Sequence, residues 1–78
     1  MRRFSIRDIL NRLKWAGGGL EGVEVEYISR GEPGGRGVIR GEDILGISCS
    51  MIELREKAIP YHRVTRIRKG DELLFQRD

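Results

Sequence analysis

The spacing of apolar residues predicts a helix at the start of the chain. Apolar side chains recur at i, i+3, i+4 and i+7, which places one stripe of a helix against a core and leaves the polar residues outside. The stripe consists of Ile6, Ile9, Leu10 and Leu13. Ser5 is positioned to cap the first free N–H groups, and Phe4 can pack on Ile9 as a hydrophobic staple. The glycine run 17–19 is expected to end the helix.

A period of two takes over further along the chain and predicts strands. Residues 23–28 alternate apolar and acidic side chains, and a turn at 31–35 should pair them with an antiparallel strand at 37–40. A short helical turn at 41–46 and a third strand at 48–54 are expected to follow.

The C-terminal third predicts a second hairpin. Pro60 lacks a backbone donor and favours an extended Ile59, so this pair should not lie in a central strand. Residues 65–69 and 72–76 should be strands joined by a two-residue loop. The predicted fold class is α+β, with one N-terminal helix packed on a mainly antiparallel sheet of about five strands. Residues 1–78 should form a single domain.

The size and the scarcity of cysteine and histidine limit the chemistry. A chain of 78 residues has room for one core, since such a domain buries about 60% of the surface of its unfolded chain. Cys49 and His62 are the only residues of their kinds, so neither an intramolecular disulfide nor a Cys/His zinc set can form. We expect no cofactor and no metal. No apolar run approaches the roughly 20 residues of a membrane span, and a cytoplasmic location is expected.

Charge is distributed unevenly along the chain. The net charge is +3. Residues 1–14 carry five basic and one acidic side chain, residues 15–54 three and seven, and residues 55–78 seven and four. If the fold brings the two basic ends together, they form one face that attracts polyanions; if it separates them, that case weakens. The abundance of charge also fits ion-pair stabilisation in a thermophilic protein.

The densest set of phosphate-compatible side chains begins at Tyr61-His62-Arg63 and continues through Arg66, Arg68 and Lys69. Guanidinium groups bind phosphate bidentately, imidazolium is a titratable donor, and tyrosine can stack or donate. The alternative is a solvated basic strand in which His62 bonds a backbone carbonyl. Its arginines would then pair with Glu72, Asp71 or Glu53.

Two further residues have a structural and a functional interpretation. Cys49 is expected to be a buried thiol, because a nucleophile would need a base and His62 is the only histidine candidate. Trp15 is expected to anchor the core or its edge; the functional alternative is a platform on which a base stacks.

Two segments resemble a known family. Ile59-Pro60-Tyr61-His62-Arg63-Val64 and the helix from Ile6 to Trp15 are similar to the RNA cyclic-group end recognition domain family of small, long-uncharacterised archaeal proteins. The resemblance covers nearly the whole chain. It implies recognition of RNA ends that carry a 2',3'-cyclic phosphate, in RNA processing or repair. In larger proteins the domain is fused to RNA-end enzymes, which implies RNA-processing enzymes as partners.

Three hypotheses follow. The leading one is a non-catalytic RNA-end binding module in which Arg63 clamps the terminal phosphate, His62 donates to it, and Tyr61 or Trp15 contacts the terminal base. The RNA backbone would be followed by Arg66, Arg68, Arg7 and Lys14. The second is an RNA-end phosphoesterase with His62 as general acid or base, which needs a partner because one histidine does half of that work. The third is a structural or adaptor domain without an RNA role.

Overall fold

The computed structural model describes residues 6–16, 18–31 and 33–77, so the expected Ser5 cap and Phe4 staple lie outside the described residues. Helix α1 spans Ile6–Ala16, as the apolar stripe predicts. The strands are β1 (Val23–Ile28), β2 (Arg36–Arg40), β3 (Gly46–Ile47), β4 (Met51–Glu53), β5 (Ala58–Pro60), β6 (Val64–Lys69) and β7 (Glu72–Gln76). Short 3-10 turns are η1 (Pro33–Gly35), η2 (Gly41–Asp43) and η3 (Tyr61–Arg63). The helix in the described residues is too short to cross a membrane.

The strands form two antiparallel sheets, so the prediction of one sheet of about five strands was wrong. The larger sheet has the order β2-β1-β6-β7 and the smaller the order β3-β4-β5. The chain leaves the larger sheet at η2 and turns back on itself between Ser48 and Met51, where backbone and Ser48 hydroxyl hydrogen bonds close a tight turn. That turn occupies the first half of the strand predicted at 48–54.

The mixed α+β class and both predicted hairpins are confirmed. Strand β2 pairs with β1, and β7 pairs with β6 across the two-residue loop of Gly70 and Asp71. Pro60 ends β5, an edge strand of the smaller sheet, where its missing N–H removes no ladder bond from a neighbouring strand.

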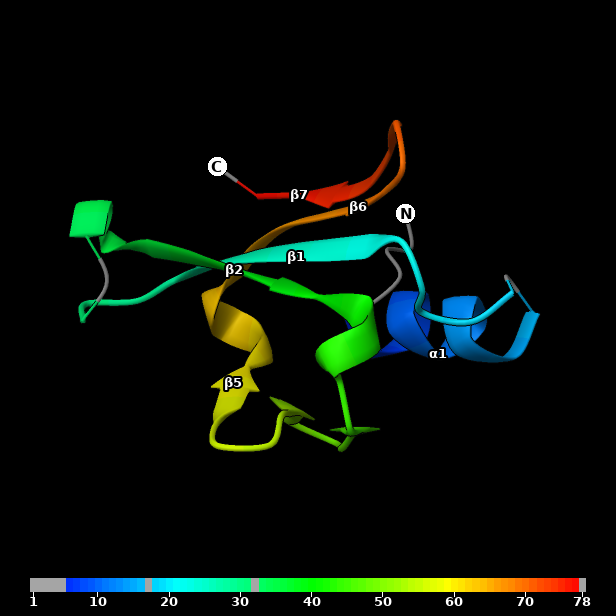
Figure 1. Ribbon diagram of the computed structural model, residues 1–78, viewed down its shortest axis with the longest axis horizontal. Helices are drawn as coiled ribbons and strands as arrows, with labels where there is room; N and C mark the ends of the chain where they lie inside the picture. The colour runs from blue at the N-terminus through cyan, green and yellow to red at the C-terminus, as the bar shows by residue number, and fades with distance from the viewer. Residues whose placement is uncertain (1–5, 17, 32, 78) are drawn as a thin grey trace, which may run out of the picture.

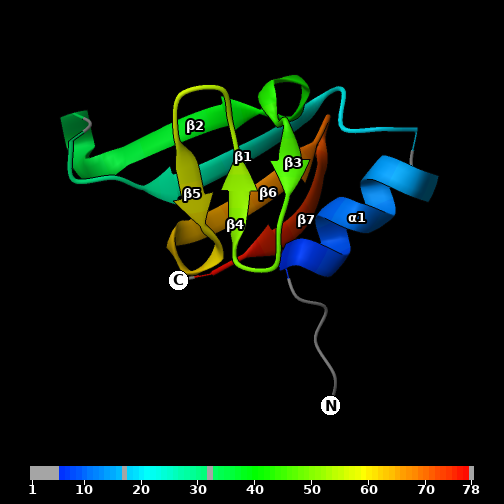
Figure 2. The same ribbon diagram turned by 90° about the horizontal axis from the view of Figure 1, so that it is seen from below.

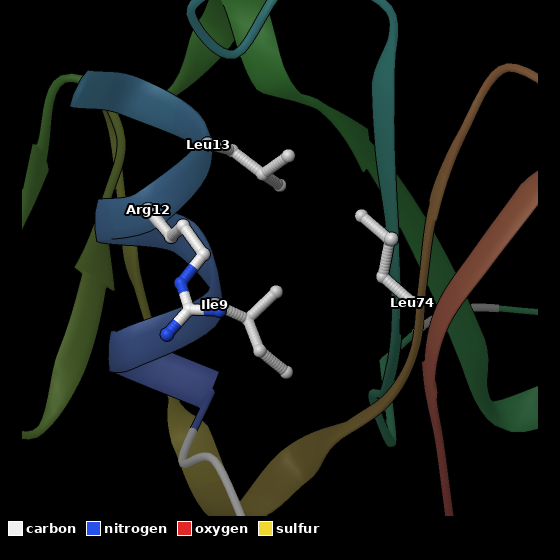
Figure 3. A pocket seen from close by; sticks show the side chains of 4 residues that line it. All are labelled: Ile9, Arg12, Leu13 and Leu74. Atoms are coloured by element: carbon white, nitrogen blue, oxygen red, sulfur yellow. The ribbon is translucent and has the colours of Figure 1, made fainter. Parts of the chain in front are cut away.

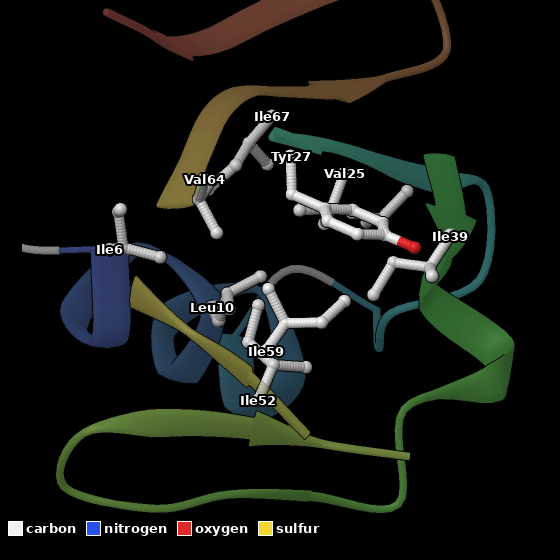
Figure 4. Packing of buried hydrophobic residues seen from close by; sticks show 10 residues of the cluster. Ile6, Leu10, Val25, Tyr27, Ile39, Ile52, Ile59, Val64 and Ile67 are labelled. Atoms are coloured by element: carbon white, nitrogen blue, oxygen red, sulfur yellow. The ribbon is translucent and has the colours of Figure 1, made fainter. Parts of the chain in front are cut away.

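Helix α1 and the smaller sheet cover the same side of the larger sheet (Figures 1 and 2). The core between these layers takes side chains from all three, including Leu10 of α1, Ile52 of β4, Ile59 of β5 and Ile67 of β6, which converge in Figure 4. These side chains are 0 to 2% exposed, so the two sheets and the helix share one apolar core.

The opposite side of the larger sheet is not covered by any described element. Along β1 the burial alternates, with Val23, Val25 and Tyr27 in the core. The residues between them, and those paired with them on neighbouring strands, point the other way. We call this surface the open face; it consists of Glu24, Glu26, Ile28, Arg36, Val38, Arg40, Arg66, Arg68, Leu73 and Gln76.

Candidate nucleic-acid interface

A pocket of about 240 Å³ lies at one end of the open face. At this end β1 terminates at Ile28, β2 begins at Arg36, and β7 terminates at Gln76. Its lining residues are Glu26, Ile28, Arg36, His62, Thr65, Arg66, Gln76 and Arg77. The pocket therefore draws on four strands and on the η3 turn, although its residues are spread over more than half of the sequence.

Arg77 is held in place from two sides. Its Nη1 donates to the backbone carbonyl of His62 at 2.7 Å, and its guanidinium lies over the Phe75 ring, 5.4 Å from the centroid. The backbone N–H of Arg77 also donates to the Thr65 carbonyl at 2.8 Å. A stacked guanidinium loses less freedom when it binds a ligand, so this side chain is preorganised at the pocket.

Arg66 is paired with an acidic residue of the neighbouring strand. Its Nη1 lies 3.4 Å from Oε2 of Glu26, and both side chains are partly exposed. The β1–β6 register, which places these two residues opposite each other, determines the pair. The expected partners Glu72, Asp71 and Glu53 were therefore wrong for Arg66.

The pocket carries an excess of positive charge. Three arginines line it against one glutamate, and the His62 imidazole is exposed beside them. One carboxylate cannot neutralise three guanidinium groups, and guanidinium is suited to bidentate binding of phosphate oxygens. The arrangement favours a small anion such as a phosphate group.

The structure brings some of the predicted site residues together. His62 and Arg66 line the pocket. Arg68 lies on the open face two residues further along β6, opposite Glu24 and Leu73. Arg63 is exposed at the end of η3 and lies outside the lining of the pocket.

Tyr61 points towards the smaller sheet. Its hydroxyl donates to the Ser48 carbonyl at 2.6 Å. Burial raises the pKa of this hydroxyl above its usual value of 10.0, and the nearby Arg7 guanidinium acts in the opposite direction. Tyr61 is therefore within electrostatic reach of Arg7 and is directed towards the smaller sheet. It does not line the pocket on the open face.

Lys14 and Trp15 lie on α1, on the far side of the larger sheet from the open face. The Lys14 Nζ lies 5.5 Å from the centroid of the Trp15 ring. Trp15 is 79% exposed, so its expected role as a core anchor was wrong. The fold separates these helical residues from the C-terminal arginines, which weakens the hypothesis of one basic face built from both ends of the chain.

Arg36 and Arg77 are the pocket cations that sequence reasoning missed. Arg36 lies in the acidic middle of the chain and reaches the pocket because it pairs with Ile28 in the β1–β2 hairpin. Arg77 follows the last strand and reaches it because β7 returns alongside β6. The two predicted hairpins could have indicated both residues, because the register of paired strands places residues that are distant in sequence on the same face of a sheet.

The described residues contain neither a candidate metal site nor a buried thiol. No group of three His, Cys, Asp or Glu residues in the described ranges is arranged to hold a metal ion. Cys49 is exposed in the turn before β4, so its expected burial was wrong.

A second pocket, of about 190 Å³, lies between α1 and β7. Ile9 and Leu13 of the helix point towards Leu74 of the strand, with Arg12 beside them (Figure 3). Three of its four lining side chains are aliphatic and offer no hydrogen bonds to an anion, so this pocket is less suited to phosphate than the pocket on the open face, which three arginines line.

The fold and the pocket define a small α+β protein with a cationic surface at one end of an open sheet. The model of the MJ1316 RNA cyclic group end recognition domain matches residues 1–77, and the chain belongs to this family. It is 37% identical over 78 residues to a UPF0248 protein of Pyrobaculum islandicum, covering 92% of this chain and 89% of that protein. It is 39% identical over 56 residues to a UPF0248 protein of Archaeoglobus fulgidus, covering 70% and 78%. No solved structure is significantly similar to the chain.

Proposed function

We propose that this protein binds RNA ends carrying a 2',3'-cyclic phosphate, in RNA processing or repair, and that the terminal phosphate occupies the pocket at the end of the open face. The observation that carries the proposal is the convergence of Arg36, Arg66 and Arg77 around one glutamate, beside His62. The family description supplies the end chemistry, because it names RNA cyclic group end recognition.

In this proposal the side chains that line the pocket have separate roles. Arg77, held by the Phe75 ring and the His62 carbonyl, presents a fixed guanidinium to the phosphate. Arg36 enters from the edge strand β2, and the exposed His62 imidazole supplies a further donor. Glu26 holds Arg66 and limits the total positive charge of the pocket.

The size of the pocket restricts what enters it. Sites for drug-sized ligands are about 300 to 1,000 Å³, whereas this one is about 240 Å³. In this proposal it holds the cyclic phosphate with its ribose and leaves the base outside. The base would then lie over the open face next to Ile28.

The test compares one oligoribonucleotide with three different 3' ends at fixed salt. Fluorescence anisotropy should show tighter binding of the 2',3'-cyclic phosphate than of the free hydroxyl. An opened monophosphate carries about −1.5 to −2 charges, more than the cyclic diester, so tighter binding of the opened form would indicate attraction by charge alone. Equal affinities for the cyclic and hydroxyl ends would overturn the end specificity.

A variant comparison locates the site. Arg36→Gln should weaken binding of the cyclic end by about tenfold, since a hydrogen bond to a charged group contributes roughly 1.5 to 3 kcal/mol. Arg55→Gln is the matched control, because Arg55 is exposed in the turn between β4 and β5, outside the pocket. If both variants lose affinity equally, the pocket is not the site.

The same mixtures address the phosphoesterase alternative, in which His62 works with a partner. Recovery of the cyclic-ended RNA unchanged supports binding alone. Accumulation of a monophosphate product with the wild-type chain, and its loss in His62→Ala, would replace the binding proposal with an enzymatic one.

A further inference from the structure

The open face continues from the pocket as a surface of arginines and aliphatic side chains. Val38, Leu73 and Ile28 are exposed large apolar residues on it, at 58%, 51% and 49%. Arg68 and Arg40 lie at its other end, opposite each other across Glu24. Exposed apolar surface rimmed by polar residues marks interaction sites, and here the apolar side chains lie among cations on one uncovered face.

The charges on this surface identify the kind of partner. Four arginines face two glutamates across the ten residues of the open face. One of the glutamates is occupied by Arg66. The remaining excess is positive and continuous with the pocket, which favours a polyanion that enters the pocket at one end.

We propose that the open face binds the nucleotides immediately 5' of the RNA terminus, with Arg68 on the phosphate backbone and Val38 and Leu73 against the bases. This inference rests on the proposed function, because the terminal phosphate in the pocket fixes where the strand begins.

The dimensions of the sheet set the length of RNA it can hold. From Arg36 to Arg40 the face extends about 13 Å along the strands, and its four strands span about 14 Å across. A stacked single strand rises about 3.4 Å per nucleotide. Because the length of about 13 Å includes the pocket end of the face, it corresponds to about three to four nucleotides, the terminal one included.

The side chains on this face also predict how sequence is read. Among the described residues, the phenylalanine, tyrosine and tryptophan rings lie away from the open face: Tyr27 is in the core, Phe75 and Tyr61 are partly buried, and Trp15 is on α1. RNA-binding sheets that select bases stack them on exposed aromatic rings. Val38 and Leu73 carry no hydrogen-bonding groups that could distinguish the edges of the bases, so their contacts should not select a sequence, and the bound RNA should be selected mainly by its end.

The test measures affinity against length with adenosine 2',3'-cyclic phosphate and cyclic-ended oligomers of two to eight nucleotides. Affinity should rise up to about three or four nucleotides and then level off. Arg68→Gln should leave the mononucleotide affinity unchanged, weaken the longer oligomers, and make the slope of log K against log salt shallower by about 0.7. Arg55→Gln should change neither measurement.

A gain of binding provides a second readout that loss of folding cannot imitate. Val38→Tyr adds a stacking ring at an exposed position of the edge strand, so it should tighten the longer oligomers by about fivefold or more, within the roughly 1 to 3 kcal/mol of base stacking, without changing the mononucleotide.

The outcomes separate this inference from the proposed function. A mononucleotide that binds the pocket, with no gain from added length and no effect of either open-face variant, would overturn the inference and leave the proposed function standing. Failure of the mononucleotide and of every cyclic-ended oligomer to bind would overturn the proposed function itself.

Discussion

The guanidinium of Arg77 shows how a single exposed side chain acquires a defined position. Its guanidinium lies over the Phe75 ring and donates to the His62 carbonyl, and the side chain lines the pocket. A planar guanidinium can lie over a ring, donate to a carbonyl and still present a fork of further N–H donors, a combination that the ammonium group of lysine cannot reproduce.

Arg77→Lys therefore separates shape from charge. The variant keeps the positive charge but loses the stacking contact and the fork of donors, so binding of cyclic-ended RNA should weaken by about fivefold to tenfold, roughly 1 to 1.4 kcal/mol. The salt dependence should stay the same, because the number of cations is unchanged. Anisotropy titrations at several salt concentrations measure both. An affinity equal to that of the wild type would mean that only charge matters at this position.

Tyr61 has a structural role that its sequence context did not indicate. Its hydroxyl connects η3, which carries His62, to the turn that precedes β4. Tyr61→Phe should lower the free energy of unfolding by about 1 kcal/mol and leave RNA binding near neutral pH intact, as measured by urea denaturation and anisotropy.

The difference in the free energy of unfolding between the wild type and Tyr61→Phe should depend on pH, because the pKa of Tyr61 is raised in the folded state. The folded chain holds the phenolic proton more tightly than the unfolded chain, so the stabilisation is fully present below pH 10.0 and is lost as pH rises through the folded-state value. The stability gap between wild type and Tyr61→Phe should shrink above that pH. A gap that widened there would contradict the assigned environment of the hydroxyl.

At the scale of elements, the β1–β2 hairpin and the turn after it orient the open face. Gly37 pairs with Tyr27, and a Cβ at this glycine would lie 2.5 Å from the tyrosine ring. Gly41 is buried where β2 gives way to η2, and a Cβ there would overlap the Leu20 carbonyl oxygen. These close approaches explain why glycine occupies both positions.

Gly41→Ala should destabilise the fold by about 2 to 3 kcal/mol, because backbone atoms must move to make room. Gly31→Ala is the control, since a Cβ at Gly31 meets nothing within 4 Å and should change stability by less than about 0.5 kcal/mol. Thermal or urea unfolding of both variants measures the difference. Equal free energies of unfolding for the two variants would show that the backbone around Leu20 moves away from a Cβ at residue 41 without loss of stability.

The sequence predicted the elements of the larger sheet better than those of the smaller one. Alternation over six residues identifies β1, and the loop at Gly70 and Asp71 identifies the second hairpin. Strands β3, β4 and β5 contain only two or three residues each, too few to display a period of two. Their pairing depends instead on the Ser48–Met51 turn and on burial of Ile52 and Ile59.

At the scale of the whole molecule, the larger sheet divides the charged residues into two groups. The apolar core and α1 occupy one side, and the arginines of β2 and β6 occupy the other. His62 and Arg66 could be predicted as neighbours because they are close in sequence. The participation of Arg36 in the pocket could not be predicted, because it follows from the order of the strands. The separation of Lys14 and Trp15 from the pocket could not be predicted either, because it follows from the side of the sheet on which the helix packs.

The central claim is that a cyclic phosphate binds in the pocket at the end of the open face, and its location can be measured directly. Adenosine 2',3'-cyclic phosphate titrated into ¹⁵N-labelled protein should shift the backbone amide resonances of Ile28, Arg36, Thr65, Arg66 and Gln76, while those of α1 and the smaller sheet stay in place. Shifts centred on Lys14 and Trp15, or none at the pocket, would contradict the claim.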